Sequence, residues 1–343
     1  MMRRPSERRV VVTQQFFDAE AAAYLRAHGC ELQVAQLPPG KTDGTLARVD
    51  LLPLLDGAAG WIVGHAHVDR TLLAALPALQ SIARRGVGYE RIDTAAVAEA
   101  GRVATIAVGG NDACVADHTL ALMLAVAHRL RESQLQMQAG SRAILVGGDL
   151  YRKTVGIVGL GRIGRAVVQR LRGFECRLLA HSPGTPALPG VAQVPLDELL
   201  QESDFITLHA PLTEATRHLV NAAAIARMKP SAIVVNTARG GLVHDGDLLA
   251  ALKAERLAGA GLDVFASESD KAFEPVTAEL VALPNVIASP HSGASTREGL
   301  ARTNLIAAMN TVAVLDGHAP PPECVVADGR PGFAAATRFP SVH

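Results

Sequence analysis

The chain has 343 residues, more than a single domain usually contains, so its length predicts two domains. Its 33 basic and 33 acidic residues balance, which gives no electrostatic reason to expect nucleic acid or an acidic membrane surface as a partner. The longest apolar run, within residues 119–127, is too short to span a bilayer, and no apolar signal-peptide region follows the N-terminal arginines. The cysteines are scattered without a C-x-x-C pair: Cys30, Cys114, Cys176 and Cys324. We therefore expect a cytoplasmic protein with reduced thiols, no metal site and no membrane segment.

The first part of the chain, from Arg9 to Ile106, alternates short apolar segments with Ala- and Leu-rich segments of helical period. This alternation predicts a parallel α/β sheet. The predicted strands are Val10–Thr13, Leu32–Ala35, Ala59–Val63, Ser81–Ala83 and Val103–Ile106. The predicted helices are Asp18–His28, Arg48–Leu55, Arg70–Leu76 and Thr94–Ala100.

A second alternating series follows one long predicted helix, Asp112–Gln138, and a break at Gly147-Gly148. Its predicted strands are Val155–Val158, Cys176–Ala180, Phe205–His209, Ala232–Asn236, Gly259–Leu262 and Val286–Ser289. Its predicted helices are Ile163–Leu171, Leu196–Glu202, Asn221–Met228 and Asp245–Leu252, and a last long helix is expected over Thr296–Leu315. Beyond Gly317 no apolar period continues, and residues 331–343 are predicted to form a disordered tail.

Two α/β series and a closing helix predict the fold class and the domains. We expect two Rossmann-like or flavodoxin-like α/β domains with parallel sheets, one inserted into the other. Residues 112–292 would form a dinucleotide-binding domain, and residues 1–111 with 293–330 a substrate domain. A ligand would lie in the cleft between them, at the carboxyl ends of the strands.

A glycine-rich motif carries the dinucleotide prediction. The predicted strand Val155–Val158 is followed by G-x-G-x-x-G at Gly159, Gly161 and Gly164, and then by a helical pattern. The first glycine permits the tight turn, the second lets the backbone approach a pyrophosphate, and the third lets helix and strand pack closely. The phosphates would bind at the N–H groups of the helix start.

The nature of the dinucleotide stays open. About twenty residues after the motif, an NAD site usually has an acid for the ribose 2′-hydroxyl, and the matching residue here is Ser182. Without a carboxylate, a 2′-phosphate is not repelled, which would admit NADP. No Lys or Arg lies between His181 and Thr216 to hold that phosphate, so NAD and NADP are both retained.

Three polar segments follow predicted strands. Each of their charged residues has an ordinary explanation alone: Arg239 as a surface arginine, Glu268 as a solvated loop acid, His291 as a helix-cap or packing residue. Together they could converge in the cleft, where a guanidinium grips a carboxylate. An imidazole paired with a carboxylate could hold a proton for acid–base chemistry near neutral pH.

These segments resemble the D-isomer-specific 2-hydroxyacid dehydrogenases, a family that includes 3-phosphoglycerate dehydrogenase and glyoxylate/hydroxypyruvate reductases. The resemblance covers residues 10–318 in the family's order. It rests on the glycine-rich motif and on the segments at 84–89 with 92–93, 111 with 115–119, 209–213, 236–240, 261–265 and 289–291.

The resemblance implies a role for each matching position. His291 would exchange a proton with the substrate oxygen with Glu268 as its partner, and Arg239 would bind the substrate carboxylate and polarise the 2-oxo group. The backbone at Val87 and Gly88 would hold the carboxylate from the other domain. The cofactor would contact the glycine-rich motif and the following residues: Arg162, Ile163, Ser182, His209, Ala210, Pro211, Thr237, Ala238 and Asp263.

Two further implications concern substrate and assembly. Arg84, Arg85 and His65 lie near the expected substrate loop, where they could accept a second anionic group such as a phosphate or could be solvated surface groups. The family implies a homodimer formed through the helix at 112–138, whereas periodicity alone would also allow a buried monomer helix.

The expected function is that of an NAD(P)-dependent oxidoreductase. It would transfer a hydride between the nicotinamide and C2 of a small D-2-hydroxy acid or 2-oxo acid of the glyoxylate, hydroxypyruvate or 3-phosphoglycerate class. One alternative is a dehydrogenase of an unusual donor such as formate or phosphite. Another is a dinucleotide-sensing protein that resembles a transcriptional corepressor.

Overall fold

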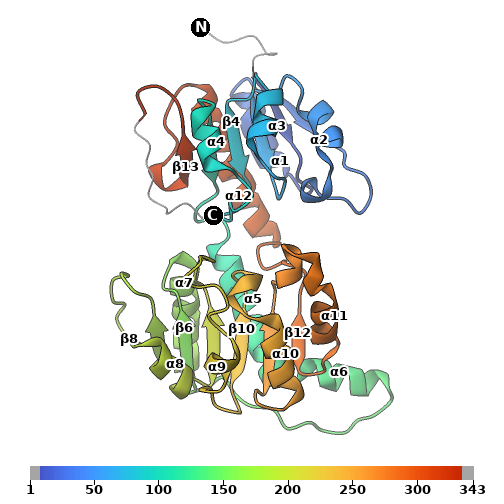
Figure 1. Ribbon diagram of the computed structural model, residues 1–343, viewed down its shortest axis with the longest axis vertical. Coiled ribbons are helices and arrows are strands. Elements are labelled where there is room, and N and C mark those ends of the chain that lie inside the picture. Colours follow the sequence, from blue (N-terminus) through green and yellow to red (C-terminus); the bar gives the residue numbers. More distant parts are fainter. Residues whose placement is uncertain (1–7, 334–343) are drawn as a thin grey trace. The chain divides into compact units, whose positions relative to one another are not determined.

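The computed structural model describes residues 8–333, which divide into two compact units. Unit 1 comprises the chain up to Asn111 and again from Ser295, and unit 2 comprises Asp112–Ala294 (Figure 1). The chain therefore enters and leaves unit 2 once, as an insertion. The prediction of disorder for 331–343 falls mostly on residues 334–343, which lie outside the described residues.

Unit 1 is built on a six-stranded sheet in the order β13-β5-β4-β3-β1-β2, parallel except for β13. Its strands are β1 Arg9–Val12, β2 Glu31–Val34, β3 Gly60–Val63, β4 Ser81–Arg84, β5 Val103–Ile106 and β13 Val325–Asp328. The helices are α1 Ala19–Ala27, α2 Arg48–Leu55, α3 Arg70–Ala75, α4 Thr94–Glu99 and α12 Arg297–Leu315. One apolar cluster includes residues of α2, α3 and α4, and another includes residues of α1 and α12, so helices cover both faces of the sheet.

Unit 2 is built on a seven-stranded, fully parallel sheet in the order β12-β11-β10-β9-β6-β7-β8. Its strands are β6 Thr154–Val158, β7 Arg177–His181, β8 Val191–Gln193, β9 Phe205–Leu208, β10 Ile233–Asn236, β11 Gly259–Leu262 and β12 Val286–Ala288. Its helices are α5 Asp112–Ala127, α6 Leu130–Gln138, α7 Arg162–Leu171, α8 Leu196–Glu202, α9 Ala222–Ile225, α10 Asp245–Lys253 and α11 Glu274–Ala282. This strand order is that of the dinucleotide-binding fold. Its switch point, where the order of successive strands reverses direction across the sheet, lies between β6 and β9. The predicted α/β fold class is confirmed.

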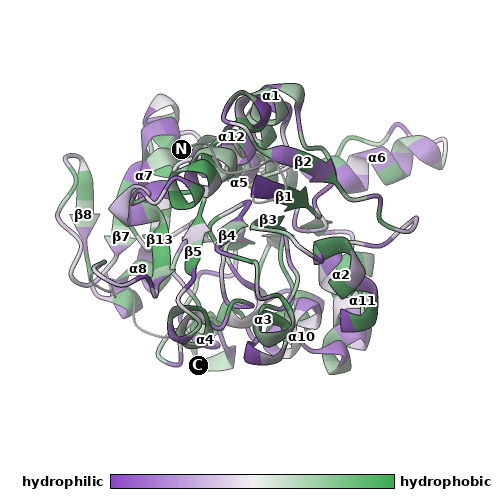
Figure 2. Ribbon diagram, turned by 90° about the horizontal axis from the view of Figure 1, so that it is seen from above, coloured by the Kyte–Doolittle hydropathy of each residue, from purple (hydrophilic) through white to green (hydrophobic). Residues whose placement is uncertain are grey.

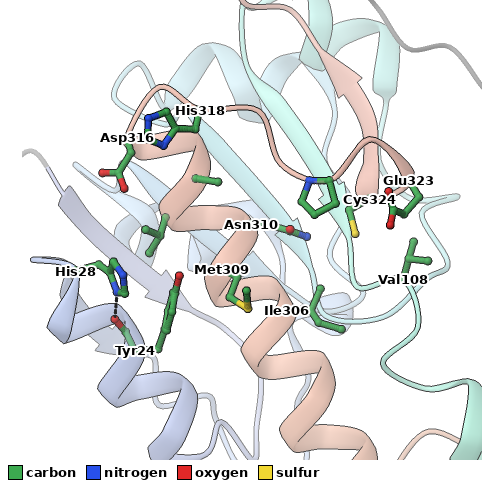
Figure 3. Close-up of a pocket in the computed structure, with 13 residues that line it drawn as sticks. Tyr24, His28, Val108, Ile306, Met309, Asn310, Asp316, His318, Glu323 and Cys324 are labelled. Atoms are coloured by element: carbon green, nitrogen blue, oxygen red, sulfur yellow. Dashed lines mark hydrogen bonds between the residues drawn. The ribbon is translucent and has the colours of Figure 1, made fainter.

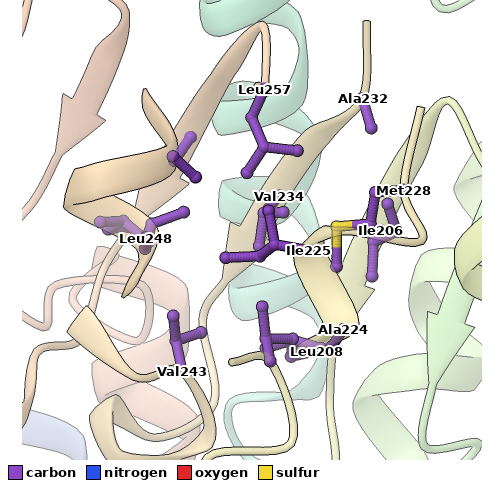
Figure 4. Packing of buried hydrophobic residues seen from close by; sticks show 14 of the residues in the cluster. Ile206, Leu208, Ala224, Ile225, Met228, Ala232, Val234, Val243, Leu248 and Leu257 are labelled. Carbon is purple, nitrogen blue, oxygen red and sulfur yellow. The ribbon is translucent and has the colours of Figure 1, made fainter. Parts of the chain in front are cut away.

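The unit 2 core packs on both faces of this sheet. Residues of α5 and α7 bury one face, and residues of α8–α11 bury the other. Figure 4 shows part of the second cluster, with Leu248, Ile225 and Val234 packed between helices and strands. Each fully buried side chain of this size contributes about 1.5–3 kcal/mol of transfer free energy.

Short polar side chains set where several helices begin. Asp18, Asp69 and Asp93 each accept the backbone N–H three residues on, at the starts of α1, α3 and α4. Thr296 does the same for α12. Such caps satisfy N–H groups that have no partner inside the helix.

The prediction of one helix over 112–138 is wrong. Two helices, α5 and α6, meet at an angle of 60°. Arg129 has a left-handed backbone (φ 52°) and its guanidinium binds both oxygens of Glu132. Because α6 has no buried residue, no packing holds it in line with α5.

Three further elements differ from the predictions. The strands β8 and β13 and the helix α11 were not predicted, and β13 lies in the region after Gly317 that shows no apolar period. β13 forms because it pairs antiparallel with the edge of β5, a long-range partner that local periodicity does not reveal. Within residues 8–333, no single helix is long and apolar enough to cross a membrane.

Candidate active site

The glycine-rich turn lies at the switch point of the unit 2 sheet. Gly159 has a left-handed backbone (φ 96°), and a Cβ there would lie 2.7 Å from the carbonyl carbon of His209, at the end of β9. A Cβ at Gly164 would lie 2.1 Å from the Gly159 carbonyl oxygen. Both glycines are therefore required by the packing of the chain on itself.

Gly161 differs from these two glycines. Its φ of −67° suits any residue, and a Cβ there would meet no heavy atom within 4 Å. Gly161 caps α7 without a side-chain hydrogen bond, and Arg162 and Ile163 form the first turn beyond it. Open space above the N–H groups of a helix start is what a bound pyrophosphate needs, so the turn fits a dinucleotide.

The loop after β7 is tied to this turn. The hydroxyl of Ser182 accepts the N–H of Leu160 (3.0 Å) and lies 2.7 Å from the Thr185 hydroxyl. From α7, Arg165 donates to the carbonyl oxygens of Leu160 (3.0 Å) and Pro186 (3.2 Å). No Lys or Arg lies between residues 181 and 216, but the fold brings Arg165 to this loop from α7.

The other predicted cofactor residues follow β9 and β10. Burial lowers the pKa of His209 to about 3, so its imidazole is neutral, and its Nε2 lies 2.9 Å from the Thr207 hydroxyl. Ala210 and Pro211 continue from it. The hydroxyl of Thr237 lies 2.9 Å from that of Thr119 on α5.

Arg239 lies in a turn that is held by Asn236, the last residue of the preceding strand β10. The buried side chain of Asn236, the last residue of β10, donates to the Arg239 carbonyl oxygen (2.8 Å) and accepts the N–H of Ala238 (3.0 Å). The guanidinium donates to the Ala238 carbonyl oxygen (2.7 Å). Asn236 belongs to the segment 236–240 recognised in the sequence, but no role was predicted for its side chain, although its place at the strand end before Arg239 was a usable signal.

Glu268 and His291 form a direct pair. Nδ1 of His291 lies 2.6 Å from Oε2 of Glu268, and the other carboxylate oxygen accepts the N–H of Phe265 (2.9 Å). The two side chains are 38% and 37% exposed, so solvent and ligands reach them. Burial acts to raise the pKa of Glu268, but the hydrogen bond and charge of His291, together with the N–H of Phe265, outweigh it, and the pKa is lowered. Glu268 is thus an ionised partner for the imidazole near neutral pH.

Asp263 holds the turn that carries His291. Its side chain, 2% exposed, accepts the hydroxyl of Ser289 (2.6 Å) and the N–H groups of Ser292 (2.8 Å) and Gly293 (2.9 Å). His118 of α5 lies 3.4 Å from it. Burial opposes ionisation of Asp263, but these hydrogen bonds keep its pKa lowered. The carboxylate is engaged by the protein itself, and its predicted contact with a nicotinamide stays a prediction.

The three charged residues follow adjacent strands. Because β10, β11 and β12 are neighbouring parallel strands, Arg239, Glu268 and His291 all lie at the carboxyl end of the unit 2 sheet. The glycine-rich turn after β6 lies at the same end. The structure brings Glu268 and His291 into contact. Arg239 follows β10, which is separated by β11 from β12, the strand before His291.

The predicted substrate residues of unit 1 lie at or just beyond the ends of β3 and β4. The guanidinium of Arg84 donates to the carbonyl oxygens of Gly88 (3.0 Å) and Arg85, and its Nη2 lies 3.1 Å from Nε2 of His65. Arg84 therefore crosses the turn that contains Val87 and Gly88 and helps to fix its shape.

An acid that sequence reasoning missed supports this region. Asp43 is 1% exposed and accepts the N–H groups of Gly64 (2.6 Å) and His65 (2.9 Å) and the hydroxyl of Thr13 (2.8 Å). It begins the 3₁₀ turn Asp43–Thr45 between β2 and α2, where no sequence pattern distinguishes it from a solvated acid.

A pocket of about 400 Å³ lies elsewhere in unit 1, along α12 (Figure 3). Tyr24, Met309 and Asn310 line it together with the segment that follows α12. None of the predicted substrate residues is among those that line it.

Comparison with known proteins identifies relatives along most of the chain. Residues 120–293 match the family model described as "D-isomer specific 2-hydroxyacid dehydrogenase, NAD binding domain". The glyoxylate reductase of Korarchaeum cryptofilum is 38% identical over 264 residues, 74% of this chain and 78% of that protein. The D-3-phosphoglycerate dehydrogenase of Archaeoglobus fulgidus is 35% identical over 90% of this chain, but the match spans only 57% of that longer protein.

A solved structure agrees with these sequence matches. The TT0316 protein from Thermus thermophilus superposes with a TM-score of 0.82 at 36% identity, over 93% of this chain and 99% of that one. The resemblance stated from the motifs is confirmed. The names of the relatives favour a 2-hydroxyacid oxidoreductase over the formate or phosphite donor and the corepressor alternatives.

Proposed function

We propose, for a chain that belongs to the D-isomer-specific 2-hydroxyacid dehydrogenase family, that Arg239, Glu268 and His291 are its catalytic residues. As a member of this family it is an NAD(P)-dependent oxidoreductase that acts at C2 of small 2-hydroxy and 2-oxo acids. The observation that carries the residue assignment is the 2.6 Å pair between Glu268 and His291. We propose the glyoxylate, hydroxypyruvate or 3-phosphoglycerate class as its substrates.

The pair gives each residue a role. With Nδ1 bonded to Glu268, the imidazolium presents its other N–H, at Nε2, as a proton donor to the forming alkoxide. The guanidinium of Arg239 binds the substrate carboxylate and stabilises the negative charge that develops on the 2-oxo oxygen. The bound nicotinamide supplies the hydride in reduction and accepts it in oxidation.

Substrate contacts from unit 1 are part of the proposal. The backbone N–H groups of Val87 and Gly88 bind the carboxylate, in a turn shaped by Arg84. Arg84 and His65 contribute positive potential and hydrogen-bond donors toward an anionic substrate.

The cofactor is NAD or NADP, held by the glycine-rich turn and the loops after β7, β9 and β10. We expect both reduced dinucleotides to serve. The hydroxyl of Ser182 does not repel a 2′-phosphate, and Arg165 reaches the same loop from α7. Ser182→Asp is expected to weaken NADPH more than NADH.

The assembly that we propose is a homodimer formed through α6 and the segment after it. This surface exposes several large apolar side chains: Leu130, Leu135, Met137, Ile144, Val146 and Tyr151. Figures 1 and 2 show α6 projecting from the body of its unit. Apolar side chains gathered on one projecting element are typical of a protein interface. The thiols of Cys30, Cys176 and Cys324 are free, which fits work in the reducing cytoplasm.

A spectrophotometric panel tests the function. Purified protein is given NADH or NADPH with glyoxylate, hydroxypyruvate and other 2-oxo acids, and the oxidation of the cofactor is followed. We expect turnover with at least one acid, abolished in His291→Asn. Reduction of NAD(P) by formate or phosphite, with no 2-oxo acid consumed, would support the unusual-donor alternative. Cofactor binding without any turnover would support the sensor.

A further inference from the structure

The first residue of α10 is a buried acid to which no role has yet been assigned. Asp245 is 3% exposed, and its Oδ2 accepts the N–H of Ala266 at 3.0 Å. Ala266 begins the single 3₁₀ turn, Ala266–Glu268, that ends at Glu268. The carboxylate of Asp245 therefore fixes the start of the segment that presents the partner of His291.

The same segment is contacted by the turn that carries Arg239. A Cβ at Gly240 would lie 2.1 Å from the carbonyl carbon of Phe265 and 2.5 Å from the nitrogen of Ala266. The backbone after Arg239 thus lies directly on the backbone before Glu268. Only glycine permits so close an approach, and the bond from Ala266 to Asp245 is made beside it.

Charge connects these groups as well. Burial raises the pKa of the Asp245 carboxyl, the bond from Ala266 and the neighbouring His244 act in the opposite direction, and the charge of Glu268 adds to the rise. Glu268 in turn interacts with His291 and Asp263. An effect of Asp245 on the pH dependence of the reaction would therefore involve the charges of His244, Glu268, His291 and Asp263.

We propose that Asp245 is a positioning residue; this rests on the proposed function. By fixing the backbone at Ala266, Asp245 holds Glu268 against His291 and beside the turn that carries Arg239. Asp245 touches neither substrate nor cofactor. Its removal frees the 265–268 segment, so the carboxylate of Glu268 no longer supports the imidazolium. The consequence is a loss of kcat that depends on Glu268 being present.

A double-mutant cycle tests this dependence. Asp245→Ala is expected to lower kcat about 10- to 100-fold, with the dissociation constant of the cofactor unchanged, because general acid catalysis contributes about 10²–10⁴-fold. In the Glu268→Gln background the same substitution should cost less than about threefold. Equal losses in both backgrounds would overturn the proposal.

Two further variants separate positioning from general damage to the fold. Asp245→Asn keeps an oxygen that accepts the Ala266 N–H, so it should retain kcat within about threefold. A loss as large as that of Asp245→Ala would contradict the proposal. The matched control is Asp247→Ala, in the same turn of α10, whose carboxylate accepts the N–H of Ala222 (2.7 Å) and lies 3.0 Å from Nδ1 of His244, with no hydrogen bond to the 265–268 segment among the described residues. It should leave kcat unchanged.

Titration of the His291 imidazole by NMR supplies a readout that needs no substrate. In Asp245→Ala the ring should lose its proton at a lower pH than in the parent protein, in the same direction as in Glu268→Gln. An unchanged titration would overturn the positioning role. If the parent protein turned over no 2-oxo acid, the proposed function would fail, while the titration would still report on Asp245.

Discussion

His291 stands in a backbone conformation that residues other than glycine adopt rarely. Its φ is 52°, and its N–H donates to the carbonyl oxygen of Asp263 (2.8 Å). The carboxylate of the same Asp263 binds the next two N–H groups, of Ser292 and Gly293. Such a conformation persists only where the surroundings fix it, and it aims the imidazole toward Glu268. The strain is thus balanced by a buried acid that itself performs no chemistry in our account.

The pair makes a prediction for the pH dependence of reduction. Reduction consumes a proton, so its rate falls as pH rises and His291 loses that proton. Glu268→Gln removes the negative charge 2.6 Å from the ring. The imidazolium then deprotonates at a lower pH, and the falling limb of the kcat profile should move to lower pH. A limb that stayed in place, or moved up, would exclude Glu268 as the partner.

His291→Asn removes the proton donor itself. We expect kcat for reduction to fall about 10²–10⁴-fold, because the alkoxide must then take its proton from water. The dissociation constant of NADH, measured by fluorescence titration, should stay as in the parent protein, since the ring is not proposed to bind the cofactor. Turnover near the parent level would refute the assignment.

At the scale of elements, the glycine-rich turn offers a matched pair of substitutions. Gly164→Ala places a Cβ 2.1 Å from a backbone oxygen that cannot move aside, so it should lower stability by about 1–3 kcal/mol. Gly161→Ala meets open space, so thermal unfolding should be unchanged while cofactor affinity falls, by about tenfold. Unaltered cofactor binding in Gly161→Ala would show that the dinucleotide does not approach this turn.

The sequence predicted most elements because their signals are local. The strands of unit 2 are short apolar runs between turns, and the glycine motif marks β6 and α7. Arg239, Glu268 and His291 could be proposed as catalytic residues because each follows such a strand. Asp245 and Asp43 were not, because only three-dimensional packing distinguishes a buried acid from a solvated one.

The wrong prediction of a single helix over 112–138 also arose because tertiary contacts are not visible in local sequence patterns. Residues 112–138 have helical character throughout, and only the backbone at Arg129 and its bond to Glu132 break them. The strand β13 likewise depends on a partner more than two hundred residues away, the strand β5. Local patterns reveal what a segment can form, whereas tertiary contacts decide where it ends.

For the whole molecule, the insertion of unit 2 into unit 1 divides the proposed functional residues between two units. Unit 2 carries the glycine-rich turn and the three residues proposed for catalysis, and unit 1 carries the turn at Val87 and Gly88 proposed for substrate binding. Each unit has its own sheet and its own buried clusters.

The proposed homodimer is tested by charge on the α6 surface. The double substitution Leu135→Glu with Met137→Glu, at side chains 47% and 59% exposed, should convert a dimer into a monomer in light scattering. Val49→Glu, on α2 and 73% exposed, is the matched control and should leave the mass unchanged. A parent protein that is already monomeric, or a double variant that stays dimeric, would contradict the interface.

Isotope transfer tests the proposed hydride transfer between a nicotinamide and C2 of a 2-oxo acid. The protein is incubated with NADH or NADPH deuterated at the transferable position of C4, together with hydroxypyruvate, and the product is examined by mass spectrometry and chiral chromatography. We predict D-glycerate with one deuterium at C2, formed by the parent protein and not by His291→Asn. A product without deuterium at C2 would exclude this hydride transfer, and a product of the L configuration would exclude D specificity.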